Sequence, residues 1–200
     1  MPNEFSQADF GDGSTRQRIL EAAYALFLKE GVASVGIESI LSRAGCARAS
    51  LYSHFGSKEA LAIAVMELHF QRWVEGWLER SAIEGEADPE RQLLAKFDLV
   101  DEWFNDLGFA GCAFVKILLE TPAEDPVHKA AAENLARIRE MVRDIAERAQ
   151  LDDPEGFSFV WHMLMEGSVV TATGGVNDAG SRAKAGAQML LRHWPRASGS

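Results

Sequence analysis

The sequence contains few cysteines and no long apolar run. Cys46 and Cys112 are its two cysteines, so neither a disulfide framework nor a four-thiolate zinc site can be built from them. No apolar run reaches the roughly eighteen residues that a membrane span needs. The first residues also lack the basic start and apolar centre of a secretory signal. We therefore expect a cytoplasmic protein without a membrane partner, in a reducing compartment.

Signatures of catalysis and of metal binding are missing too. The chain has no G-x-S-x-G elbow, no phosphate-binding glycine loop and no redox C-x-x-C. Its five histidines fall in no metal-ligand spacing. His162 and Glu166 share one helix face, a spacing more typical of polar groups that line a pocket than of a metal site. The sequence predicts a protein that is not an enzyme and that needs no metal or cofactor.

Strand-like alternation of apolar and polar residues is absent as well. Apolar residues recur instead at helical spacing from Ser14 onward, with breaks at glycine and proline. We predict an all-α fold of about nine helices. It begins with a flexible arm at residues 1–13, continues with a three-helix DNA-binding domain at residues 14–60, and ends with a larger helical ligand-binding and dimerisation domain at residues 61–200.

The predicted small domain has a helix-turn-helix pattern. Ser14 can cap a first helix that ends at Gly31, with Gln17 reaching back as in a capping box. Two short helices follow, one in "GIESILSRAG" and one in "ARASLYSHF", joined by "AGCA". Helices this short need packing against a neighbour to be stable. Three helices with a tight glycine-containing turn between the last two are typical of the helix-turn-helix motif.

Charge is unevenly distributed along the chain. The whole chain carries a net charge of −10, which by itself argues against a nucleic-acid partner. Residues 14–58, however, contain six basic and three acidic residues, a local charge of +3. A basic head therefore precedes an acidic body, and the head is the part suited to bind DNA.

The segment "ARASLYSHFGSKEAL" carries the predicted DNA contacts. If Leu51 and Phe55 face the neighbouring helices, the opposite face presents Arg48, Ala49, Ser50, Tyr52 and Ser53. Arginine can bind guanine bidentately, serine can bond base edges or phosphates, and an alanine methyl can contact thymine. Tyr52, His54 and Lys58 suit phosphate oxygens.

At these residues the chain resembles the TetR-type transcriptional repressors, most specifically through "LYSHFGSKEAL" preceded by "AGC". The resemblance covers residues 14 to 62. It implies a homodimeric repressor with a variable ligand-binding body, in which Tyr52, His54 and Lys58 approach the DNA backbone. Val35, Gly36 and Glu38 depart from the Thr or Ser and the Arg that many members carry at the second helix. Glu38 is expected to repel phosphate.

The rest of the chain is predicted to bind the effector and to form the dimer interface. A long helix from Ser57 to about Arg80 leads into it. The last two helices, Glu155 to about Thr173 and Asp178 to about Trp194, are expected to pair with their mates as a four-helix bundle, with Asp178 or Asn177 as a cap. An apolar or aromatic effector is expected to contact aromatic, Met, His and Glu side chains, namely Trp103, Phe114, Trp161, His162, Met165 and Glu166.

The function predicted from these features is that of a ligand-responsive repressor. It binds a near-palindromic double-stranded operator as a homodimer, and a small-molecule effector releases it. The alternative is a helical small-molecule or protein-binding module that keeps the scaffold without specific operator binding, which Glu38 and the modest charge of +3 favour.

Overall fold

In the computed structural model of the chain, residues 13–79, 86–106 and 109–197 are described. Over these ranges the chain forms nine α-helices and one π-helical segment, and the β pairing is limited to a single bridge between Leu151 and Arg196. The predicted all-α fold with about nine helices is confirmed. The predicted flexible arm lies, except for Gly13, outside the described residues.

The chain divides into two compact units. The head unit comprises the described residues of Pro2–Gln71 together with Ala113–Asn134. The body unit comprises those of Arg72–Cys112 and Leu135–Ser200. Residue 60, where the sequence predicts a domain boundary, lies within helix α4 (Lys58–His69) of the head unit. The functional domains at 14–60 and 61–200 stay a prediction.

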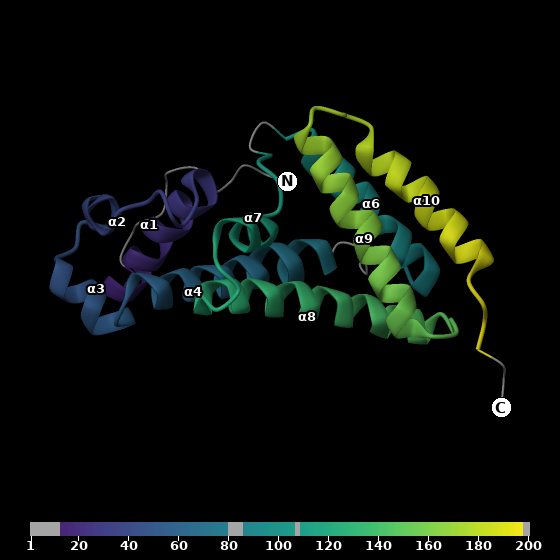
Figure 1. Ribbon diagram of the computed structural model, residues 1–200, viewed down its shortest axis with the longest axis horizontal. Coiled ribbons are helices and arrows are strands. Elements are labelled where there is room, and N and C mark those ends of the chain that lie inside the picture. The colour runs from purple at the N-terminus through teal and green to yellow at the C-terminus, as the bar shows by residue number, and fades with distance from the viewer. Residues whose placement is uncertain (1–12, 80–85, 107–108, 198–200) are drawn as a thin grey trace. The chain divides into compact units, whose positions relative to one another are not determined.

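Helix α1 (Thr15–Glu30) is the central helix of the head unit (Figure 1). The hydroxyl of Ser14 accepts a hydrogen bond from the amide of Gln17 at 3.3 Å, which confirms the predicted cap. The second half of the capping box is wrong, because the side chain of Gln17 donates instead to Glu21 at 2.7 Å.

Helices α2 (Ile37–Ala44) and α3 (Arg48–Phe55) pack on α1 and on each other. Gly45 ends α2 in the left-handed conformation, with φ 61°, which glycine adopts without the steric cost of a Cβ. Ile40 and Leu51 are fully buried between the three helices. Burial of these apolar side chains gives two helices of eight residues a stability that they lack alone.

The long helix predicted from Ser57 changes its hydrogen bonding half-way. The Ser57 hydroxyl caps α4 by accepting from the amide of Ala60 at 3.1 Å. From Phe70 to Glu79 the backbone continues as a π-helix, η1, rather than as an α-helix. Two further helices follow later in the chain: α7 (Ala113–Glu120), which belongs to the head unit, and α8 (Pro126–Arg148), whose residues are shared between the units.

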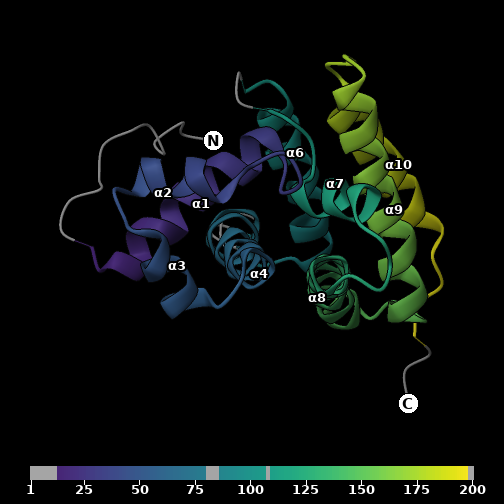
Figure 2. The same ribbon diagram turned by 60° about the vertical axis from the view of Figure 1, so that its left-hand side comes forward.

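In the body unit α6 (Pro89–Phe104), α9 (Pro154–Thr173) and α10 (Ala179–His193) pack side by side (Figure 2). Phe97 of α6 and Trp161 of α9 are both almost completely buried, and their ring centroids lie 4.9 Å apart. The predicted bounds of the last two helices, α9 and α10, agree with the observed ones to within one residue at every end. The core of the unit lies between α6, α9 and α10, and Val142 and Ile145 of α8 also belong to it.

Helix α10 begins against α6 rather than on a cap of its own. Asp101 of α6 accepts a hydrogen bond from the amide of Ser181 at 3.1 Å. The predicted cap, Asp178, makes no such side-chain bond, because its carboxylate pairs with Arg182 at 2.8 Å. Gly180 permits the approach, since a Cβ on it would lie 2.8 Å from the Cα of Asp101.

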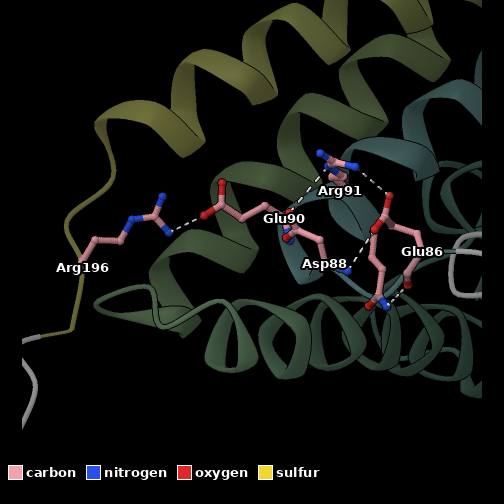
Figure 3. A network of polar contacts seen from close by, with 6 residues as sticks. Glu86, Asp88, Glu90, Arg91 and Arg196 are labelled. Carbon is pink, nitrogen blue, oxygen red and sulfur yellow. Dashed lines mark hydrogen bonds and ion pairs between the residues drawn. The ribbon is translucent and has the colours of Figure 1, made fainter.

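A polar network surrounds the start of α6 (Figure 3). Asp88 caps the helix by accepting from the amide of Glu90 at 2.9 Å, and Arg91 lies 3.7 Å from both Glu86 and Asp88. Glu90 also pairs with Arg196 at 2.8 Å. The chain end thus binds back to α6.

Candidate nucleic-acid interface

Helix α3 presents one polar face to solvent and buries the opposite one. Leu51 is fully buried and anchors the helix. On the other face the predicted DNA-contacting side chains are exposed at Arg48, Ala49, Tyr52, Ser53 and His54, and half-buried at Ser50 and Lys58. Tyr52 is 42 % exposed although it is a large aromatic residue, so it contributes little to the core. The structure brings all seven residues together on α3 and the first turn of α4.

Arg48 is held from two sides. Its NH1 group donates to the carboxylate of Glu38 at 2.7 Å, across the turn between α2 and α3. Its NH2 group lies 3.4 Å from the hydroxyl of Tyr52, and the guanidinium carbon lies 5.7 Å from the centre of the Tyr52 ring. The bond with Tyr52, followed by its charge and that of Glu38, raises the pKa of Arg48. The guanidinium therefore stays charged and oriented.

Two further basic residues of α1 lie at the edge of the head unit. The guanidinium of Arg16 lies 4.9 Å above the ring of Phe55, at the end of α3. Arg18 donates to the sulfur of Cys46 at 3.4 Å. The side chain of Arg16 is exposed and covers the apolar end of α3, so it can both protect Phe55 and reach a nearby phosphate.

The predicted effector-binding residues fall in both units. Trp103, Trp161, His162, Met165 and Glu166 belong to the body unit, and Phe114 belongs to the head unit. Trp161, His162 and Met165 are buried in the body, whereas Trp103 is half-buried against Trp73 at a centroid distance of 4.8 Å. Phe114 is buried against His69, 5.3 Å away. Five of the six predicted residues thus belong to the same compact unit, and Phe114 does not.

Three polar atoms in this group lack a hydrogen-bond partner among the described residues. They are Nε1 of Trp161, Nε2 of His162 and one carboxylate oxygen of Glu166. The other carboxylate oxygen of Glu166 lies 3.5 Å from His162 Nε2. Buried polar atoms are normally hydrogen-bonded. Trp161, His162 and Glu166 all belong to α9.

A small pocket lies in the head unit, between α1, α4 and α7. Gly31, Val65, His69 and Ile117 are among its lining residues. Its volume is about 30 Å³, enough for a water molecule or two but not for an organic effector. Neither this pocket nor the place of His69 in it could be predicted from the sequence, because nothing in the local pattern distinguishes a histidine at the end of α4 from other polar positions.

Two kinds of site are not found in the part of the chain that the structure describes. No group of three or more His, Cys, Asp and Glu residues is placed to hold a metal ion. No described helix is both long and apolar enough to cross a membrane.

Comparison with known proteins identifies the head. Residues 19–65 match the family of bacterial regulatory proteins named tetR, a segment that runs from α1 into α4. A solved structure of a putative TetR-type transcriptional regulator from Streptomyces avermitilis extends the likeness to the whole fold. It is 27 % identical with a TM-score of 0.80, over 90 % of this chain and 97 % of that one. The head of this chain therefore has a TetR-type sequence, and the chain as a whole has the fold of a TetR-type regulator.

Curated relatives match this chain over shorter segments. An uncharacterised helix-turn-helix regulator of Mycobacterium tuberculosis is 46 % identical over 55 residues, which are 28 % of this chain and 27 % of the relative. The helix-turn-helix repressor NemR of Escherichia coli is 29 % identical over 107 residues, 53 % of each chain. The match therefore spans about a quarter to a half of these relatives.

A further structural neighbour has been solved with DNA. The TetR-family regulator CifR, in a structure that contains double-stranded operator DNA, is 20 % identical to this chain with a TM-score of 0.73. The likeness covers 94 % of this chain and 100 % of that one. At this identity it shows a shared fold.

Proposed function

We propose that this chain is a ligand-responsive transcriptional repressor that binds a near-palindromic operator as a homodimer and is released by a small-molecule effector. The observation that carries the proposal is the exposed polar face of α3, where Arg48, Tyr52 and His54 face solvent while Leu51 anchors the helix. An exposed helix with base-reading and phosphate-binding side chains is what recognition in a major groove requires.

The residues of this face divide by the contacts that they can make. Arg48, Ala49 and Ser50, in the first turn of α3, read base edges. Tyr52, Ser53, His54 and Lys58 bind phosphate oxygens and set the register of the helix on the duplex. The operator complex of the structural neighbour CifR supports the same class of partner for this chain.

The dimer is formed by α9 and α10. Phe159, Met163 and Val170 lie on one side of α9 and are 46 %, 64 % and 62 % exposed in the single chain. Met189 of α10 is 62 % exposed. Large apolar side chains at helical spacing gain stability when a second copy covers them. In simple helix-turn-helix dimers the two recognition helices lie about 34 Å apart, so the operator has two related half-sites.

The effector binds the body unit at Trp161, His162 and Glu166, where the Trp161 indole N–H can donate a hydrogen bond to it and the Glu166 carboxylate can accept one from it. Met165 and Trp103 supply apolar contacts, and Phe114 stays a predicted contact. An effector that prefers the state with low DNA affinity lowers operator binding, and DNA lowers effector binding by the same factor. A nearly complete release requires about a 10⁴-fold preference.

Footprinting on DNA from upstream of the gene tests the proposal. Protection of a sequence with two related half-sites is the expected result, and Tyr52→Phe should weaken it with little change in melting temperature. The rival function is a helical binding module without operator specificity. It is favoured by the exposed carboxylate of Glu38 in the first turn of α2, which repels phosphate, and by the modest charge of the head. Absence of protection even at low salt would support the module and contradict the repressor.

A further inference from the structure

Glu38 lies where a DNA-binding face has least use for a carboxylate. It stands in the first turn of α2, and its side chain is 73 % exposed. A carboxylate at this position repels phosphate and lowers the affinity for any DNA. Its one charged partner in the described chain is Arg48, the first residue of α3, at 2.7 Å. Glu38 can therefore act on DNA binding in two ways, by repelling phosphate directly and through its bond to Arg48.

The pair contributes little to the stability of the fold. The Arg48 side chain is 62 % exposed, and an ion pair between exposed side chains contributes little because water and salt screen it. A role in folding therefore does not account for the contact. What the contact does set is the direction of the Arg48 side chain and the net charge of the pair.

The contacts leave part of the guanidinium open. Arginine carries five N–H donors, and the bonds to Glu38 and Tyr52 occupy one on NH1 and one on NH2. Three donors remain for DNA. Because the guanidinium is fixed by a carboxylate on one side and a phenol on the other, it loses little further freedom when it binds. An unrestrained arginine would instead reach any neighbouring phosphate, which carries no sequence information.

We propose that Glu38 determines the sequence specificity of the head by holding Arg48 toward base edges and away from the phosphate backbone. The inference rests on the proposed operator binding. Glu38 is thus a positioning residue, and Arg48 is the residue that contacts guanine. The carboxylate lowers affinity for all DNA, but it lowers affinity for non-operator DNA more, so the ratio between the two rises.

Removing the carboxylate should reverse both effects. In Glu38→Gln the guanidinium is released and one negative charge is lost, so binding to a scrambled duplex should strengthen and its salt dependence should steepen by about one counterion. Specificity should fall at least about fivefold, the lower limit for one bidentate base contact. Sequences selected from random DNA should lose preference at the position that Arg48 reads.

The experiment compares four full-length chains on an operator duplex and on a scrambled duplex across a salt series. They are the wild type, Glu38→Gln, Arg48→Ala and the double variant. Glu30→Gln is the control for charge, since Glu30 is an exposed acid at the end of α1 in the same unit. Melting temperatures of all variants exclude misfolding as the cause.

The expected result is a loss of specificity in Glu38→Gln that is absent from Glu30→Gln and that disappears when Arg48 is already alanine. The inference is overturned if Glu38→Gln keeps the wild-type sequence preference, or if its loss of specificity persists in the double variant. In those cases wild-type operator binding stands. A wild-type chain that selects no operator overturns the proposed function and this inference together.

Discussion

The hydroxyl of Tyr24 lies 3.1 Å from Nδ1 of His69, which connects α1 with the last residue of α4. The His69 ring also packs on the Tyr24 ring at 5.9 Å and on that of Phe114, from α7, at 5.3 Å. Burial lowers the pKa of His69 from 6.5 to about 4, because a charged imidazolium would lose its hydration there. His69 is neutral at pH 7 and joins three helices of the head unit.

We expect the free energy of unfolding to fall more steeply between pH 6.5 and about 4 in the wild type than in His69→Gln. In that interval the unfolded chain binds a proton on His69 that the folded chain excludes, so acid favours unfolding. The contribution is at most about 3 kcal/mol, because the ring keeps some contact with solvent.

Urea unfolding of both proteins over this pH range measures the difference in slope. The comparison uses the slope of the free energy of unfolding against pH. The carboxylates titrate alike in both proteins and therefore contribute equally to both slopes, and a loss of stability in His69→Gln that is the same at every pH does not change its slope. Parallel curves for the two proteins would show that His69 is not kept neutral by the fold.

Met163→Glu is expected to turn the proposed dimer into a monomer at the same protein concentration. Met163 lies in the middle of α9 and its side chain points to solvent in the single chain, so a charge there leaves the monomer intact but is desolvated in the dimer. Leu119→Glu is the matched control, because Leu119 of α7 is 82 % exposed and lies in the other unit.

Light scattering with size-exclusion chromatography gives the mass of each variant. A Met163→Glu protein with the mass of the wild-type dimer would contradict the proposed interface. A wild-type monomer would contradict the dimer itself. Loss of the dimer in Leu119→Glu as well would mean that a charge at any exposed apolar position disrupts the dimer, so that Met163 could not be assigned to the interface.

Much of the fold could be predicted from local patterns in the sequence. The spacing of Ile37, Ile40 and Leu41, followed by Gly45, predicts α2 correctly. An apolar helix face and a glycine that ends the helix in the left-handed conformation are both properties of neighbouring residues. The order of the helices follows in the same way. For the candidate site, the same reasoning placed Leu51 inward and Tyr52 outward on α3, and the structure agrees.

The remaining features depend on contacts between distant residues. The bond between Asp101 and the amide of Ser181 joins positions 80 residues apart, so the start of α10 could not be predicted from Asp178 alone. The pairing of Glu38 with Arg48 requires the angle between α2 and α3, which the sequence of the turn does not specify. The π-helix at Phe70 has no local signal in the apolar spacing.

Gly180→Ala should destabilise the body unit by about 1–3 kcal/mol, although alanine favours helices. A Cβ at residue 180 would lie 2.5 Å from Oδ1 of Asp101 and 2.8 Å from its Cα, and the backbone cannot rotate away as a side chain can. Gly186→Ala in the same helix is the control, because its Cβ would meet Leu164 at an ordinary 3.5 Å.

Thermal unfolding of both glycine variants tests the close approach of α10 to α6. Gly186→Ala should melt at or slightly above the wild-type temperature, and Gly180→Ala should melt below it. Equal melting temperatures for the two variants would mean that the helices can separate at Asp101 without cost.

The chain end should stabilise the body unit mainly through Trp194. The Trp194 indole donates to the carbonyl of Asp152 and its ring packs edge-on to Phe157 at 5.3 Å, while the pair between Arg196 and Glu90 is 46 % and 38 % exposed. Partly buried aromatic area outweighs an exposed ion pair. Trp194→Ala should therefore cost about 2–3 kcal/mol and Arg196→Ala about 1 kcal/mol or less.

Urea unfolding of Trp194→Ala and Arg196→Ala at neutral pH compares the two contributions. Glu90→Gln provides the matched control for the ion pair, and it should lose no more stability than Arg196→Ala, because Arg196 also donates to the carbonyls of Ala149 and Leu191. A larger loss in Arg196→Ala than in Trp194→Ala would place the stabilisation in the polar network of Figure 3 rather than in the aromatic contact.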